Sequence, residues 1–204
     1  MTLGAKVQRI YQHMSILSLL FELIGKSVPD ALKDWDDMVG AWCFDNASQF
    51  PEACITEIYL GPAAYVFDHA FERVILAYGI SVPQLMARNK VRMRGFPNVN
   101  ESVRNALGEK AFTVDKGHYL GHASGGELDI NLFPHRRSLN RGWSKDGRRF
   151  RAMERFVADN PGALFFHRPV YDDETWIPAT LEYGVFRPDK TWWVENFQNK
   201  GVDA

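Results

Sequence analysis

The spacing of apolar residues changes along this chain, and this change constrains the fold more than any other feature. Before about residue 95, apolar side chains recur every three or four positions, which is the spacing of amphipathic helices. After Gly108 they gather in short runs rich in aromatic and β-branched residues, separated by turn-forming residues, as is typical of strands. The pattern predicts an α+β fold with a mainly helical N-terminal half.

The N-terminal half is predicted to contain three long helices. The first covers residues 5–24, and the second runs from Pro29 to about Trp42. The third begins at Pro62, because a first helical turn tolerates proline, and it keeps helical spacing until Gly79. We therefore expect residues 1–95 to form a helical region.

A composition shift near residue 95 predicts a second domain over residues 96–204. Its first element is a short helix from Asn100 to Leu107. Two extended pieces then flank a turn at Gly125-Gly126, and a helix from Arg148 to Ala158 follows them. The predicted extended segments are residues 111–114, 119–120, 128–133, 163–171, 179–186 and 191–197.

Composition excludes several classes of protein. With 46% hydrophobic and 24% charged residues, the chain is typical of soluble globular proteins. The cysteines, Cys43 and Cys54, cannot supply a paired CxxC zinc site or a disulfide-rich scaffold. The apolar run at residues 16–24 is too short to span a bilayer. It is also unlike a signal peptide, because it contains a carboxylate and is followed by Lys26 rather than by a small-residue cleavage site. We therefore expect no membrane partner, and either a cytoplasmic location or export by a route independent of a signal peptide.

Charge is distributed unevenly although the formal net charge is only −1. Residues 110–155 contain ten Lys and Arg against five Asp and Glu, whereas residues 1–90 contain seven against ten. A basic stretch of this kind suits a polyanionic partner such as nucleic acid, although charge runs are also common on ordinary solvated surfaces. The charge pattern therefore needs support from sequence motifs.

The same stretch contains a series of short motifs. They are Asp115-Lys116-Gly117-His118, Gly125-Gly126, Asn131-Leu132-Phe133-Pro134-His135, Leu139-Asn140-Arg141-Gly142-Trp143 and Met153-Glu154. This series resembles the non-specific DNA/RNA endonucleases of the ββα-metal (His-Me finger) superfamily, especially the nuclease domains of bacterial toxins. Their signature is D-R/G-G-H, a glycine pair, N-L-x-P-Q and L-N-x-G. The likeness covers residues 112–186 and implies a ββα-metal catalytic core on a mixed or antiparallel sheet.

The resemblance implies a magnesium-dependent hydrolase, with Mn²⁺ or another divalent cation as an alternative metal. His118 matches the general base that deprotonates the attacking water, and Asn140 matches the asparagine that binds the metal. Glu154 takes the place of a helix carboxylate that organises the water shell of the metal. Lys116 replaces the commoner arginine, so it can contact phosphate as a point charge without a bidentate fork.

The remaining implied roles are supporting ones. Asn131, Asp115 and His122 are expected near the site, and His135 stands where glutamine is usual. We expect substrate contacts from the arginine cluster, represented by Arg136, Arg137 and Arg141. The implied partners are DNA, RNA or both, and a cognate immunity protein if the chain is an antibacterial toxin.

The chemistry of phosphodiester hydrolysis favours the same residue types. It needs an activated water and neutralisation of extra negative charge, and histidine is the side chain whose ordinary pKa lies near neutrality. Magnesium keeps several waters and prefers oxygen ligands, so one asparagine together with phosphate oxygens can suffice.

The position of Glu154 departs from the pattern. It lies fourteen residues after Asn140, and one continuous helix would separate the two by roughly 21 Å at about 1.5 Å per residue. We therefore expect the run Ser144-Lys145-Asp146-Gly147 to interrupt the helix and let the chain fold back.

Other functions are compatible with parts of the motif. The chain could be a catalytically silent nucleic-acid-binding or protein-interaction module, in which His118 is an ordinary hairpin residue and Asn140 a loop residue or helix cap. An esterase using Ser124 would lack the G-x-S-x-G spacing. A zinc site formed by His118, His122 and His135 would lack an evident fourth ligand.

Overall fold

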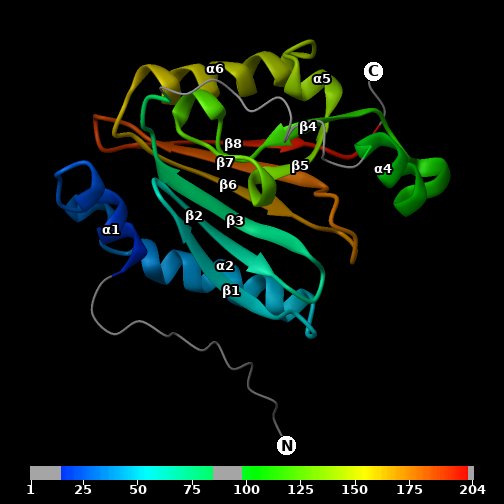
Figure 1. The fold of residues 1–204 in the computed structure, drawn as a ribbon, viewed down its shortest axis with the longest axis horizontal. Coiled ribbons are helices and arrows are strands. Elements are labelled where there is room, and N and C mark those ends of the chain that lie inside the picture. The colour runs from blue at the N-terminus through cyan, green and yellow to red at the C-terminus, as the bar shows by residue number, and fades with distance from the viewer. Residues whose placement is uncertain (1–14, 85–97, 202–204) are drawn as a thin grey trace, which may run out of the picture.

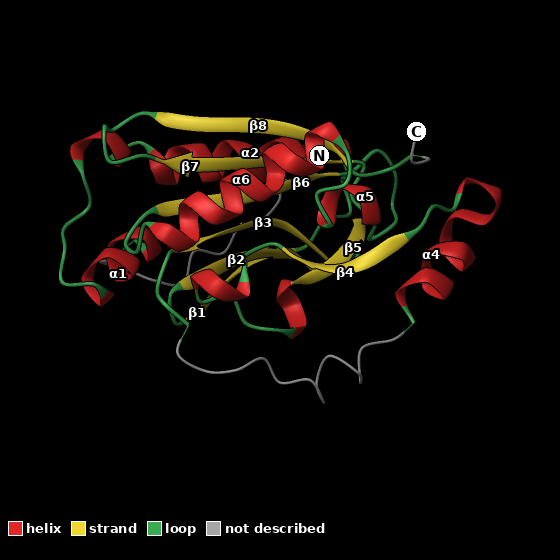
Figure 2. Ribbon diagram, turned by 90° about the horizontal axis from the view of Figure 1, so that it is seen from above, coloured by secondary structure: helices red, strands yellow, loops and turns green. Residues whose placement is uncertain are grey.

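The computed structural model describes residues 15–84 and 98–201. Its centre is a six-stranded sheet with the order β1-β2-β3-β6-β7-β8, in which all neighbouring strands are antiparallel. A two-stranded antiparallel sheet, β4 and β5, lies against it (Figures 1 and 2). The strands are β1 (Ile55–Leu60), β2 (Ala63–Asp68), β3 (Arg73–Ile80), β4 (Val114–His118), β5 (Leu132–Arg136), β6 (Leu164–Val170), β7 (Thr180–Phe186) and β8 (Trp192–Gln198).

Helices α1 (Ile16–Leu23) and α2 (Trp35–Gln49) cover one face of the large sheet (Figure 1). A 3-10 turn at Asp30–Leu32 lies between them in the chain. Their apolar side chains form one core cluster with the sheet, in which Trp35 stacks on Trp192 of β8 at 5.7 Å between ring centroids. Burial of these rings and aliphatic chains is the main force that holds this layer.

Helix α6 (Lys145–Asp159) and the β4–β5 hairpin cover the opposite face (Figure 1). Phe150 of α6 contacts Tyr183 and Phe197 of the sheet as well as His135 of the hairpin. The short helix α5 (Arg137–Asn140) connects β5 to α6, and α4 (Val99–Leu107) packs beside β4 through a smaller apolar cluster. The hairpin, α5 and α6 together form a strand–strand–helix unit on the sheet.

The α+β class and the antiparallel sheet are confirmed. The first predicted helix is confirmed over residues 16–23, and its predicted part before residue 15 lies outside the described residues. The second helix exists but starts at Trp35 and continues to Gln49. Within residues 15–84 and 98–201, no helix has both the length and the apolar character needed to cross a membrane.

The third predicted helix, from Pro62 to Gly79, is wrong. These residues form the hairpin β2–β3, and every residue of β3 is buried. A strand buried on both faces has an almost continuous apolar run, which fits helical spacing as well as extended spacing. Strands β1, β2 and β3, which are half of the large sheet, therefore come from the region expected to be helical. Strand β3 also pairs with β6, so the sheet joins the two predicted domains. The predicted boundary at residue 95 itself lies outside the described residues.

The elements predicted for the second half are largely confirmed. Helix α4 and strands β6 to β8 occur at their predicted positions, whereas the predicted extended segments 111–114, 119–120 and 128–133 overlap β4 only at Val114 and β5 only at residues 132–133. Helix α6 begins three residues earlier than predicted, because the hydroxyl of Ser144 accepts a hydrogen bond from the Gly147 amide at 2.9 Å and caps the first turn.

Candidate functional site

The β4–β5 hairpin provides the frame of the candidate site. In its register Asp115 pairs with His135, Gly117 with Phe133, and His118 with Leu132. Because side chains alternate along a strand, Asp115 and Gly117 share the face that carries the buried Phe133 and His135. Lys116 and His118 share the other face, at the end of β4.

Gly117 is required by this packing. A side-chain carbon at this position would collide with Cβ of His135 on the neighbouring strand. The glycine of the Asp-Lys-Gly-His motif therefore lets the buried ring of His135 pass directly under the strand that ends in His118.

Asp115 joins the hairpin to α5. Its carboxylate accepts hydrogen bonds from Nε of Arg137 at 3.1 Å, from Nε and Nη2 of Arg141 at 2.6 and 3.0 Å, and from Nδ2 of Asn140 at 3.3 Å. Partial burial opposes ionisation, but the hydrogen bonds from Arg141, Asn140 and Arg137 outweigh it and lower the pKa of Asp115. The carboxylate is thus a fixed negative charge that anchors the helix.

Asn140 lies at the end of α5 between Asp115 and His135. Its amide nitrogen donates to Asp115 at 3.3 Å, and the same side chain lies beside the buried imidazole of His135. Magnesium accepts an amide oxygen together with water and phosphate oxygens. The donor chemistry of this position therefore fits the metal role that the motif implies.

Asn131 is fully buried and braces the loop that follows His118. Its side-chain oxygen accepts from the Leu120 amide at 2.8 Å, and its nitrogen donates to the carbonyls of Leu120 and Glu127 at 2.8 and 2.7 Å. Its own carbonyl accepts from the Tyr119 amide at 3.0 Å. Asn131 thereby fixes the path of the chain next to His118, which is the supporting position expected from the sequence.

The loop braced by Asn131 passes over α6. The 3-10 turn His122–Ser124 contacts helix α6. The side chain of His122, in this turn, is partly exposed. Ser124 is only 5% exposed, which makes it unsuitable as the nucleophile of an esterase. The turn therefore brings the region after His118 alongside α6, the helix that carries Glu154.

The predicted interruption between Asn140 and Glu154 exists, but it lies at residues 141–144, because Lys145, Asp146 and Gly147 form the first turn of α6. Helix α5 ends at Asn140, the chain turns at Gly142 with φ of +72°, and α6 starts at Lys145. Two separate helices replace the single helix on which the 21 Å estimate relied. Glu154 lies on α6, where its carboxylate accepts from Nη1 of Arg151 at 2.9 Å.

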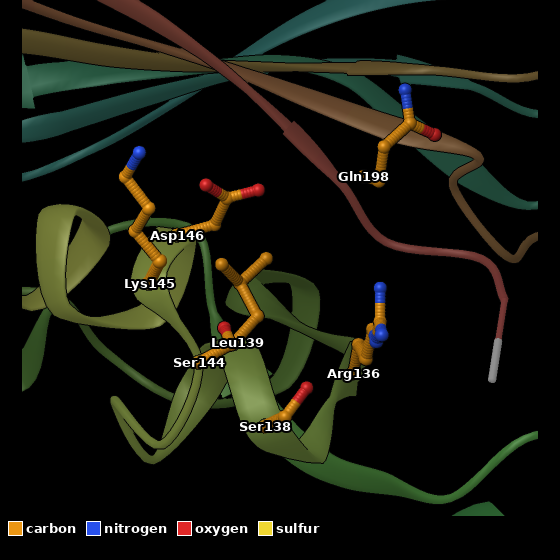
Figure 3. Close-up of a pocket in the computed structure, with 7 residues that line it drawn as sticks. All are labelled: Arg136, Ser138, Leu139, Ser144, Lys145, Asp146 and Gln198. Atoms are coloured by element: carbon orange, nitrogen blue, oxygen red, sulfur yellow. The ribbon is translucent and has the colours of Figure 1, made fainter. Parts of the chain in front are cut away.

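The three arginines expected to bind substrate occupy different environments. Arg137 and Arg141 both pair with Asp115, and Arg141 also lies over the Trp143 ring at 5.0 Å. Arg136 instead lines a small pocket of about 180 Å³ at the start of α6, together with Lys145 of α6 and Gln198 of β8 (Figure 3). Of the three, Arg136 is the one that does not share the Asp115 carboxylate.

Among the described residues, no group of three or more His, Cys, Asp or Glu side chains is placed to hold a metal ion. The three-histidine zinc site considered from the sequence is therefore not formed.

A buried column of rings beneath the site was not anticipated from the sequence. His135 stacks on Phe133, Phe150 lies between His135 and His167, and His167 packs on Tyr183 at 3.8 Å between centroids. None of the four imidazole nitrogens has a hydrogen-bond partner within the described part of the chain. Burial lowers the pKa of His135 to about 3 and that of His167 well below its ordinary value.

Sequence comparison adds no family assignment to this geometry. The chain matches no protein-family model, and no curated protein matches it significantly.

Proposed function

We propose that this protein is a metal-dependent endonuclease that hydrolyses phosphodiester bonds of DNA, RNA or both with little sequence preference. The observation that carries the proposal is the link between Asp115 and Asn140. It ties α5 to the same strand that ends in His118, so that a candidate base and a candidate metal ligand belong to one strand–strand–helix unit.

The chemistry assigned to this unit is a direct displacement by water. Neutral His118 accepts a proton from water, the water oxygen bonds to phosphorus, and the bond from phosphorus to the leaving oxygen breaks as that oxygen takes a proton from solvent. A bound magnesium ion supplies charge neutralisation on the phosphate oxygens, with Asn140 as its ligand from the chain. Lys116, on the same face as His118, and Arg136 supply positive charge for the neighbouring backbone.

Weak sequence preference follows from the kinds of contact available. Lysine and arginine side chains recognise phosphates, which are the same at every position of a nucleic acid. We therefore expect many cleavage sites in one substrate and binding that weakens steeply with salt. If the chain acts as an antibacterial toxin, its partner in the producing cell is an immunity protein that blocks this site.

The decisive experiment is digestion of plasmid DNA, linear DNA and RNA with magnesium and with chelator. Cleavage that needs the cation and disappears in His118→Ala supports the proposal. Exposed Lys33→Ala, outside the basic stretch, serves as the control and should cut like the parent. Salt-sensitive binding by the parent without cleavage under any metal condition would instead identify a catalytically silent nucleic-acid-binding module.

A further inference from the structure

A second opening lies beside the hairpin, on the side of strands β1 to β3. It is a mainly apolar groove of about 410 Å³ between the sheet, the hairpin and the loop that carries Trp176. Four aromatic side chains line it: Phe67, Tyr119, Phe133 and Trp176. Its size is that of a pocket for a small planar molecule.

The groove borders the candidate site through two residues of the hairpin unit. Leu132 lines the groove and is the register partner of His118. Tyr119, which also lines it, follows His118 directly in the chain. A substrate strand whose phosphate lies at His118 would therefore place a neighbouring nucleotide next to this groove.

Arg73, another lining residue, has unused hydrogen-bond donors. It is only 2% exposed, its Nη1 donates to the carbonyls of Asp173 and Thr175, and its guanidinium lies 4.1 Å from the ring centroids of Phe50 and Tyr171. Its Nε and Nη2 have no partner among the described residues. Both atoms are buried on the α2 face of the sheet, where Asp68 is the register partner of Arg73, so the groove itself offers mainly apolar and aromatic contacts.

The surrounding charges favour a neutral occupant over a phosphate. Burial lowers the pKa of Arg73, whereas the nearby Asp68 and Asp173 raise it and already balance its charge. Glu72, exposed at the groove, would repel a phosphate. A neutral aromatic ring is not repelled by Glu72, and the aromatic walls offer it stacking partners.

We propose that this groove receives one unpaired nucleobase of the substrate strand, next to the cleaved phosphate. Rings of the groove stack on the base. In a duplex the faces of a base are covered by its neighbours, so only a single-stranded or unpaired base can enter. The inference rests on the proposed nuclease function and gives it a substrate class: single-stranded or locally unpaired nucleic acid.

The test is binding of a fluorescein-labelled DNA strand of about 12 nucleotides, alone and as a blunt duplex, in chelator to prevent cleavage. The variants are Trp176→Leu and Phe67→Leu, which keep an apolar side chain but remove the ring, so that one remains informative if the other misfolds. Phe44→Leu is the matched control, because Phe44 is 72% exposed on α2, on the opposite face of the sheet.

Loss of one stacked ring corresponds to about a tenfold weaker affinity, since stacking on one base is worth about 1–3 kcal/mol. We expect that loss for the single strand in Trp176→Leu and Phe67→Leu, and less than about a twofold change for the duplex or for Phe44→Leu. Unchanged single-strand affinity in both groove variants, or equal losses for strand and duplex, would overturn the inference.

Parallel digestions with magnesium separate this inference from the proposed function. If cleavage requires His118 but has the same rate in the groove variants, the proposed nuclease function is supported and the proposal that the groove binds a base is contradicted. Ring-dependent binding of the single strand without cleavage would support the groove and count against the nuclease.

Discussion

Mild acid should destabilise this protein because two imidazoles are buried without hydrogen-bond partners. The pKa of His135 in the folded chain is about 3, against an ordinary value near 6.5, so the unfolded chain binds a proton more readily below pH 6.5. Stability is complete above that pH and falls as pH drops toward the folded pKa. From pH 7 to pH 5 the loss for one such histidine is about 2 kcal/mol.

Burial also lowers the pKa of His167, so this histidine adds a further loss of stability between pH 7 and pH 5. The window lies above the ordinary pKa values of aspartate and glutamate, so carboxylates contribute little to it. Urea unfolding at both pH values measures the loss directly.

His135→Gln isolates one of the two contributions. The loss of stability between pH 7 and pH 5 should shrink by about 2 kcal/mol in this variant, because glutamine does not titrate. His69→Gln, which changes an exposed imidazole outside the column, should leave the parent loss unchanged. An identical loss in His135→Gln and in the parent would refute the reasoning, since it would mean that His135 takes up a proton without unfolding.

Four further predictions concern the candidate site. His118→Ala should lower turnover by about a hundredfold or more with nucleic-acid affinity retained, and parent activity should rise with pH through the neutral range. Equal cleavage rates of the variant and the parent in single-turnover digests would exclude the role of His118 as general base. Asp115→Asn should shift the magnesium titration of cleavage several-fold toward higher concentration, because α5 loses its charged anchor, whereas an overlaid titration curve would contradict this. Gly117→Ala should cost about 1–3 kcal/mol in urea unfolding through its collision with His135, while Gly40→Ala, in open space on α2, should be neutral or stabilising. Lys116→Ala should lower cleavage and Lys116→Arg should preserve or raise it, which steady-state rates will decide.

Sequence periodicity predicted the second half of the fold well because its elements are bounded by turn-forming residues. Helix α6 has one buried and one exposed face, which gives it a clear period, whereas β6 and β7 are largely buried on both faces and were recognised by their aromatic and β-branched residues between loop residues. Strands β2 and β3 lack this asymmetry, because sheet neighbours and helices bury them from all sides. Only their pairing with β1 and β6, which is a tertiary contact, distinguishes them from a helix.

The candidate site was predicted in its residue types but not in its internal connections. The motif indicated that Asp115 and Asn140 belong to one site, and their hydrogen bond supplies the contact that spacing alone could not. Arg137 and Arg141 looked like free phosphate ligands in the sequence, yet Asp115 holds both. The groove at Trp176 was not predictable, since its walls come from segments more than a hundred residues apart.

The pairing of β3 with β6 has a consequence for how the chain folds. Ile80 and Leu164 are register partners, so residues 81–163 form one long connection between two adjacent strands. Closing a loop of that length costs on the order of 4 kcal/mol in chain entropy before any contact is made. During folding, β3 should therefore pair with β6 late and slowly, after the connection between them has become compact and brought its ends together.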